Sequence, residues 1–194
     1  MISKLSKKIV NQLNILDDEQ ELYEYGFFIL LSQILYFIIA IIIGTICETV
    51  FESIIFYIAF QFIRRYAGGY HAATETRCEI LSTLSILACI VVIRLSKTYD
   101  IQTALLIISA LSAVCIFVFC PLDTPEKPLT DKEFRYFRKV SWLILLAIVV
   151  AIIVSYIFKF KIFTVPCCLS LVLESILLTA GKIKRISQKN NVKT

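Results

Sequence analysis

Histidine is almost absent from this chain, which carries only one, His71, among its 194 residues. The seven cysteines are an odd number and include no Cys-x-x-Cys pair. A structural zinc site needs four closely spaced ligands, so the sequence predicts free thiols and no metal. No Gly-x-x-x-x-Gly-Lys-Ser/Thr stretch is present, so neither a nucleotide phosphate loop nor any other cofactor is expected.

Glycine, proline and charge are also scarce. Five glycines and four prolines leave no Gly/Ser/Pro-rich linker, and there is no internal repeat, so residues 1–194 are expected to form a single domain. Charged residues make up only 18% and hydrophobic residues 58%, against about a quarter and about a half in soluble domains. The net charge of +5 lies beside apolar blocks, which favours anionic lipid or an acidic partner over nucleic acid.

What the chain does have is long apolar blocks. Crossing a bilayer takes about 20 helical residues, and most of these blocks reach or approach that length. The second block is shorter and contains Glu52, so tilted, re-entrant and sheltered arrangements all remain open for it. The sequence predicts an all-α, polytopic membrane protein with six transmembrane helices. The six blocks are Phe27–Ile46, Thr49–Ile63, Ile80–Leu95, Ala104–Cys120, Ser141–Phe158 and Ile162–Ala180.

The basic residues indicate the orientation of these spans. If the N-terminus is cytoplasmic and the chain changes sides at each block, 16 of the 20 Lys and Arg residues fall on the inside and 4 outside. Cytoplasmic loops carry such an excess of positive charge. We therefore expect a multi-pass membrane protein with both termini and the segment 64–79 in the cytoplasm.

The N-terminal segment 1–25 is predicted to be an amphipathic interfacial helix. Its apolar residues recur at spacings of three and four, which places them on one helix face. No apolar run follows before Phe27, so a secretory signal is not expected. The apolar face can lie on the membrane or pack against another part of the protein, and the pattern does not decide between the two.

The segment "RRYAGGYHAATETRC", residues 64–78, combines His71 with a cysteine seven positions later. A thiol becomes a good nucleophile when a base takes its proton, and histidine suits that role near neutral pH. Cys78 precedes the third apolar block, so it is expected in the first turn of a helix, where the helix dipole favours a thiolate. Arg64, Arg65 and Arg77 add positive potential.

A working pair of these side chains requires the chain to bend. In one straight helix, seven residues would separate His71 and Cys78 by about 10 Å, whereas proton transfer needs about 3 Å. Gly68 and Gly69 supply backbone freedom for a bend. From spacing alone the alternative stays open, in which His71 is an interfacial side chain, Cys78 an inert thiol and the arginines only determinants of topology.

Two separated stretches resemble the accessory gene regulator B (AgrB) family, the membrane cysteine endopeptidases of Gram-positive quorum sensing. The first is "RRYAGGYHAATETRC" and the second is "CPLDTPEKPL", residues 120–129. The resemblance implies that His71 and Cys78 form the catalytic pair and that Arg64 and Gly69 are functionally important. It implies no reliable third catalytic residue, and Glu75, Glu79 and Asp123 remain possible orienters of His71.

The resemblance also implies a substrate and a reaction. An AgrD-like precursor peptide would lose its acidic C-terminal tail to Cys78, and the resulting thioester would be closed into a thiolactone or lactone ring. A homodimer is a further arrangement that the resemblance implies. Two rival readings remain: a polytopic transporter or exporter of a small signalling peptide, with His71 as a polar gate, and a non-catalytic membrane scaffold of a signalling system.

Two further groups of polar residues remain. The segment 121–140 is predicted to be a basic cytoplasmic loop, in which Lys127 and Lys132 either hold the acidic tail of a precursor or serve only as positive-inside charges. Glu174 lies within the sixth apolar block, where an ionisable group is either functional or paired with a polar neighbour.

Overall fold

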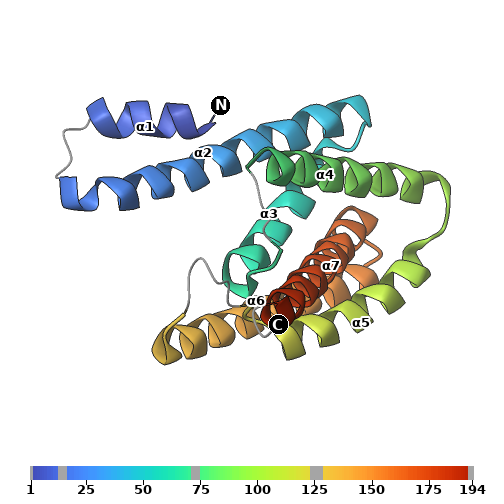
Figure 1. Cartoon of the computed structure of the whole chain (residues 1–194). Helices are drawn as coiled ribbons and strands as arrows, with labels where there is room; N and C mark the ends of the chain where they lie inside the picture. The colour runs from blue at the N-terminus through green and yellow to red at the C-terminus, as the bar shows by residue number, and fades with distance from the viewer. Residues whose placement is uncertain (1, 13–16, 71–74, 123–128, 192–194) are drawn as a thin grey trace.

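The computed structural model describes residues 2–12, 17–70, 75–122 and 129–191. Within these ranges the chain forms seven α-helices and no strand, so the predicted all-α class is confirmed (Figure 1). The helices are α1 (Ile2–Gln12), α2 (Asp17–Ile46), α3 (Val50–Ala67), α4 (Glu75–Thr98), α5 (Gln102–Phe119), α6 (Asp131–Ile157) and α7 (Lys161–Asn191).

Five of the described helices are long and apolar enough to cross a membrane, namely α2, α4, α5, α6 and α7. The prediction of six such helices is therefore one too many by this measure. The second apolar block forms α3, which has 18 residues and thus a length of about 27 Å, but which carries Glu52, Arg64 and Arg65. Successive helices from α2 to α7 run back and forth across the molecule, and α3 takes its place in that alternation (Figure 1).

Helix α7 forms the centre of the bundle. In its apolar window 67% of the residues are buried, whereas the corresponding figure for α2 is 6%. It packs against α3, α5 and α6, and every residue from Thr164 to Leu171 is buried. Since the apolar side chains of α2 face outward instead, a bilayer would solvate α2 while α7 stays within the protein.

The N-terminal helix α1 folds back along the first half of α2 (Figure 1). Ser6 and Val10 are buried there, and Lys7 forms an ion pair with Glu24 at 3.4 Å. Of the two arrangements left open by the sequence, the structure thus has α1 packed on the protein itself. The helix spans Ile2–Gln12, and residues 17–25 of the predicted amphipathic segment belong to α2.

A cluster of ion pairs ties the start of α3 to the end of α4. The Lys97 ammonium lies 2.8 Å from a carboxylate oxygen of Glu52 and also donates to the Glu48 carbonyl, while Arg94 pairs with Glu48 at 3.3 Å. Because α3 and α4 run in opposite directions, the other ends of these two helices, which carry Arg64 and Cys78, lie at the opposite side of the bundle.

Residues 131–140 of the predicted basic loop 121–140 are helical. Helix α6 begins at Asp131, and Thr130 caps it: the Thr130 hydroxyl accepts from the Glu133 backbone N–H while the Glu133 carboxylate accepts from the Thr130 backbone N–H. Lys132 is exposed in the first turn of this helix. Asp123 and Lys127 lie outside the described residues.

Candidate active site

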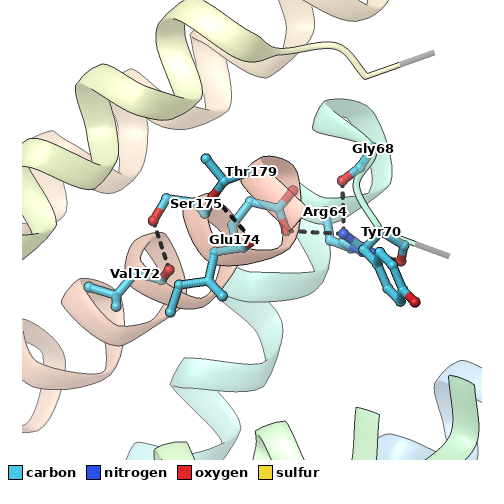
Figure 2. Close-up of polar contacts among 8 residues, drawn as sticks. Arg64, Gly68, Tyr70, Val172, Glu174, Ser175 and Thr179 are labelled. Atoms are coloured by element: carbon cyan, nitrogen blue, oxygen red, sulfur yellow. Dashed lines mark hydrogen bonds and ion pairs between the residues drawn. The ribbon is translucent and has the colours of Figure 1, made fainter. Parts of the chain in front are cut away.

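Arg64, in the last turn of α3, organises the chain that leaves this helix. One guanidinium nitrogen, Nη1, donates to the Gly68 carbonyl at 3.0 Å and the other, Nη2, to the Tyr70 carbonyl at 2.7 Å (Figure 2). Gly68 and Gly69 have φ angles of 78° and 145°, which favour glycine. A Cβ atom on Gly69 would lie 1.6 Å from Arg64 Nη1. Residues 68–70 therefore form a tight turn around the guanidinium, called the Arg64 turn below.

One face of α7 supports the Arg64 turn from the other side. The Tyr70 backbone N–H donates to the Leu177 carbonyl at 3.0 Å. At Gly181 a Cβ atom would lie 3.0 Å from the backbone of both Gly69 and Tyr70, so the turn crosses α7 where α7 has no side chain. Residues 174, 177 and 181 share one helix face, and the fully buried Glu174 presents its carboxylate oxygen Oε2 3.8 Å from Arg64 Nη1 (Figure 2).

The Arg64 turn also contacts the beginning of the second sequence motif. The Leu122 backbone N–H donates to the Ala67 carbonyl at 2.8 Å, and the Leu122 carbonyl oxygen lies 2.7 Å from where a Cβ atom on Gly68 would stand. The motifs "RRYAGGYHAATETRC" and "CPLDTPEKPL", which are more than forty residues apart, are thus joined through backbone contacts.

Cys78 lies in the first turn of α4, as the sequence predicts. Its side chain is half-buried. The helix N-terminus next to it favours an anion. Cys120, Cys167 and Cys168 are buried instead, and burial raises the pKa of the Cys120 thiol, so this thiol is a weaker candidate nucleophile.

The remaining predicted site residues are only partly assembled here. The structure brings Arg64 and Gly69 into contact, whereas Arg65 is exposed on α3 beside the Tyr66 ring and Arg77 is exposed on α4. His71 lies outside the described residues, between the Arg64 turn and α4. Among the residues that the structure describes, no three His, Cys, Asp or Glu side chains lie together in a way that could hold a metal ion.

Sequence reasoning missed three parts of this arrangement. It noted Glu174 as an ionisable group in an apolar block but assigned it no partner, and it gave no role to Leu177 or Gly181. An acidic residue in one apolar block and an arginine at the end of another are a signal for pairing, because charges within a membrane are usually paired. The backbone contacts of Leu177 and Gly181 leave no such signal.

Comparison with known proteins identifies the family. The family model described as "Accessory gene regulator B" matches residues 2–178. The chain is 27% identical over 151 residues to AgrB-like protein 2 of Clostridium perfringens, covering 74% of this chain and 71% of the relative. It is 24% identical over 202 residues to protein FsrB of Enterococcus faecalis, covering 93% and 82%, and 26% identical over 135 residues to accessory gene regulator protein B of Staphylococcus intermedius, covering 69% and 62%.

No solved structure matches the chain. The family match nevertheless spans both sequence motifs, all five apolar spans in whole or in large part, and the residues that form the Arg64 turn. The chain belongs to the accessory gene regulator B family.

Proposed function

We propose that this protein is a membrane cysteine endopeptidase that removes the C-terminal tail of an AgrD-like quorum-sensing precursor and promotes closure of a thiolactone or lactone ring. His71 and Cys78 are its catalytic pair. The observation that carries the proposal is the Arg64 turn: it fixes the backbone directly before residue 71, while Cys78 lies in the first turn of the next helix, α4, with its thiol half-buried.

The helix bounds support this pairing. In a single straight helix the two side chains would be about 10 Å apart, too far for proton transfer. However, α3 ends at Ala67 and the chain turns at residues 68–70 before α4 begins at Glu75. Gly68, Gly69 and the Arg64 guanidinium thus end α3 before residue 71, and the further bend between His71 and Cys78 is part of the proposal.

The reaction is an acyl transfer in two steps. The Cys78 thiol gives its proton to His71 and the sulfur attacks a backbone carbonyl of the precursor, forming a C–S bond. The C–N bond then breaks, and His71 returns the proton to the departing amine of the tail. A thiol or hydroxyl within the remaining peptide attacks the thioester, closes the ring and restores the Cys78 thiol. When the ring closes through a thiol, one thioester replaces another, so the ring-closing step needs no ATP.

The precursor and the orientation complete the proposal. Both termini and the Arg64 turn face the cytoplasm, because the segments on that side contain most of the Lys and Arg residues of the chain. Lys127 and Lys132, with the other basic residues of segment 121–140, hold the acidic tail of the precursor near Cys78 by charge attraction. Two copies of the chain in the membrane form a homodimer.

The test uses the full chain in lipid nanodiscs and an AgrD-like precursor peptide. Cys78→Ala, Cys78→Ser and His71→Ala are expected to abolish cleavage, whereas Cys47→Ser, which alters a half-exposed thiol at the other end of the bundle, retains it. Intact-mass analysis of the wild type is expected to reveal an acyl adduct on Cys78. Cleavage by Cys78→Ala would overturn the proposal, and vectorial peptide movement without any adduct would favour a transporter instead.

A further inference from the structure

Glu174 is a buried acidic side chain that the proposed reaction does not use. It is 0% exposed, and neither of its carboxylate oxygens has a hydrogen-bond partner among the described residues. Its charge contact is Arg64, whose Nη1 lies 3.8 Å from Oε2, too far for a hydrogen bond (Figure 2). Burying a carboxylate in an apolar core is unfavourable unless it is paired, so Arg64 is the group that stabilises the buried Glu174 carboxylate.

We infer that Glu174 is a positioning residue that acts through Arg64: it holds the guanidinium in the orientation that shapes the turn leading into His71. The inference rests on the proposed function, because it assigns the turn the task of presenting His71 to Cys78. Glu174 itself touches neither reacting group in this account.

The geometry of the guanidinium supports this role. Its donors lie in a rigid plane, so directing Nη1 at one carbonyl and Nη2 at another requires the whole group to keep a single orientation. Nη1, which donates to the Gly68 carbonyl, is also the nitrogen nearest to Glu174. The Arg64 side chain is 19% exposed, so without an opposing charge it has an alternative orientation toward the surface.

Helix α7 adds a second reason. Glu174 lies one turn before Leu177, whose carbonyl accepts the Tyr70 N–H, and two turns before Gly181, against which the turn packs. The same face of α7 thus holds the turn in two ways: directly, at the Tyr70 N–H and at Gly181, and through Arg64, which binds the Gly68 and Tyr70 carbonyls. Loss of the Glu174 charge would weaken the contacts made by Arg64, while the direct contacts to α7 remain.

A purely structural ion pair between α3 and α7 makes a different prediction. Its loss would destabilise the bundle but would leave the reactivity of a folded protein's Cys78 unchanged. A positioning role instead changes how well His71 assists ionisation of the thiol. The two roles can be distinguished by the rate of Cys78 alkylation at two pH values. At high pH a thiol ionises without a neighbouring base, so assistance from His71 affects the rate only near neutral pH.

The experiment measures alkylation of Cys78 by iodoacetamide in the full chain in nanodiscs, resolved by site with mass spectrometry, at pH 7.0 and pH 9.5. The quantity compared is the ratio of the alkylation rate at pH 7.0 to the rate at pH 9.5. His71→Ala is expected to lower this ratio. Glu174→Gln is expected to lower it about tenfold, in the same direction and with an unchanged rate at pH 9.5. Glu52→Gln is the matched control, because it removes another largely buried, paired carboxylate at the far end of α3 and leaves the ratio unaltered.

Coupling to Arg64 is tested with a double variant. Arg64→Lys keeps the charge but cannot donate to two carbonyls in one plane, so it lowers the ratio as Glu174→Gln does. Because the two residues act as a unit, Arg64→Lys combined with Glu174→Gln is expected to be no worse than the poorer single variant. Multiplied effects in the double variant would mean that Glu174 does not act through Arg64.

The outcomes separate this inference from the proposed function. An unchanged ratio in His71→Ala means that the dyad itself is wrong, and the inference falls with it. A lowered ratio in His71→Ala with an unchanged one in Glu174→Gln overturns only the positioning role. Rates altered by the same factor at both pH values mean that Glu174 affects access to Cys78 rather than its ionisation, which also overturns the positioning role. If Glu174→Gln does not yield folded protein, Glu174→Asp, which withdraws the charge by one methylene, has to lower the ratio for the inference to stand.

Discussion

Arg64 and Gly69 depend on each other in a way that a single distance makes plain. The guanidinium occupies the space that a side chain on Gly69 would fill, since a Cβ atom there would lie 1.6 Å from Nη1. Arg64 in turn needs the carbonyls of Gly68 and Tyr70 on the two sides of this glycine. The functional importance that the family resemblance implies for Arg64 and Gly69 thus has one common physical cause.

Gly69→Ala tests this dependence. The added methyl group displaces the Arg64 guanidinium and requires a φ of 145°, which an L side chain rarely adopts, so we expect precursor cleavage to fall at least about a hundredfold. Cleavage of the precursor by purified protein in nanodiscs is the measurement. Gly26→Ala is the matched control: no atom lies within 4 Å of its Cβ position in α2, so activity is retained. Full activity of Gly69→Ala would mean that the turn is not needed.

How far the site was predictable differs from residue to residue. The place of Cys78 at a helix start follows from the apolar block that begins two residues later, because hydrophobic pattern marks where a buried helix begins. The pairing of Arg64 with Glu174 does not follow, since the two residues come from different helices and no local pattern records which side chains meet in space. The site at His71 stays a prediction, as that residue lies outside the described ranges.

At the scale of elements, the sequence predicted which segments form helices but not where each helix begins and ends. Each apolar block corresponds to one helix from α2 to α7, because about 20 apolar residues in sequence have one stable form in a bilayer. The helices extend beyond the blocks, however. Helix α3 continues through Arg64 and Arg65, and α6 begins at Asp131, ten residues before the apolar block at Ser141. Hydropathy measures immersion in lipid, whereas backbone hydrogen bonds and caps set the helix ends.

Gly181 connects the last helix to the site, which leads to a second prediction. A methyl group at Gly181 would stand 2.4 Å from the Leu122 Cδ2 atom and 3.0 Å from the backbone of Gly69 and Tyr70. Gly181→Ala therefore pushes the Arg64 turn away from α7, and we expect cleavage of the precursor to fall by about tenfold to a hundredfold.

Leu122→Ala provides the companion measurement. Combined with Gly181→Ala, it removes the closer of the contacts and is expected to restore part of the lost activity, while the backbone contacts prevent full recovery. Leu122→Ala alone serves as the reference for the double variant. If Gly181→Ala cleaved the precursor at the rate of the unaltered protein, the close approach of α7 would have no part in catalysis.

At the scale of the whole molecule, the two ends of the bundle carry different kinds of charge. The end formed by the start of α3 and the end of α4 holds acidic and basic residues in mutual pairs, including Glu52 with Lys97. The opposite end holds Arg64, the start of α4 and the exposed basic residues of α6, among them Lys132. This difference agrees with the uneven distribution of Lys and Arg along the sequence, from which the second end is predicted to face the cytoplasm.

Two half-exposed cysteines allow this orientation to be measured directly. Cys47 follows the end of α2 and Cys78 opens α4, so the alternation of helices places their thiols at opposite ends of the bundle. In spheroplasts with an intact membrane, a membrane-impermeant maleimide is expected to label Cys47 and to leave Cys78 unlabelled. Permeabilisation should add the label on Cys78. Cys47→Ser and Cys78→Ser each remove one signal and so assign it, and labelling of Cys78 from outside would place the candidate active site on the wrong side for a cytoplasmic precursor.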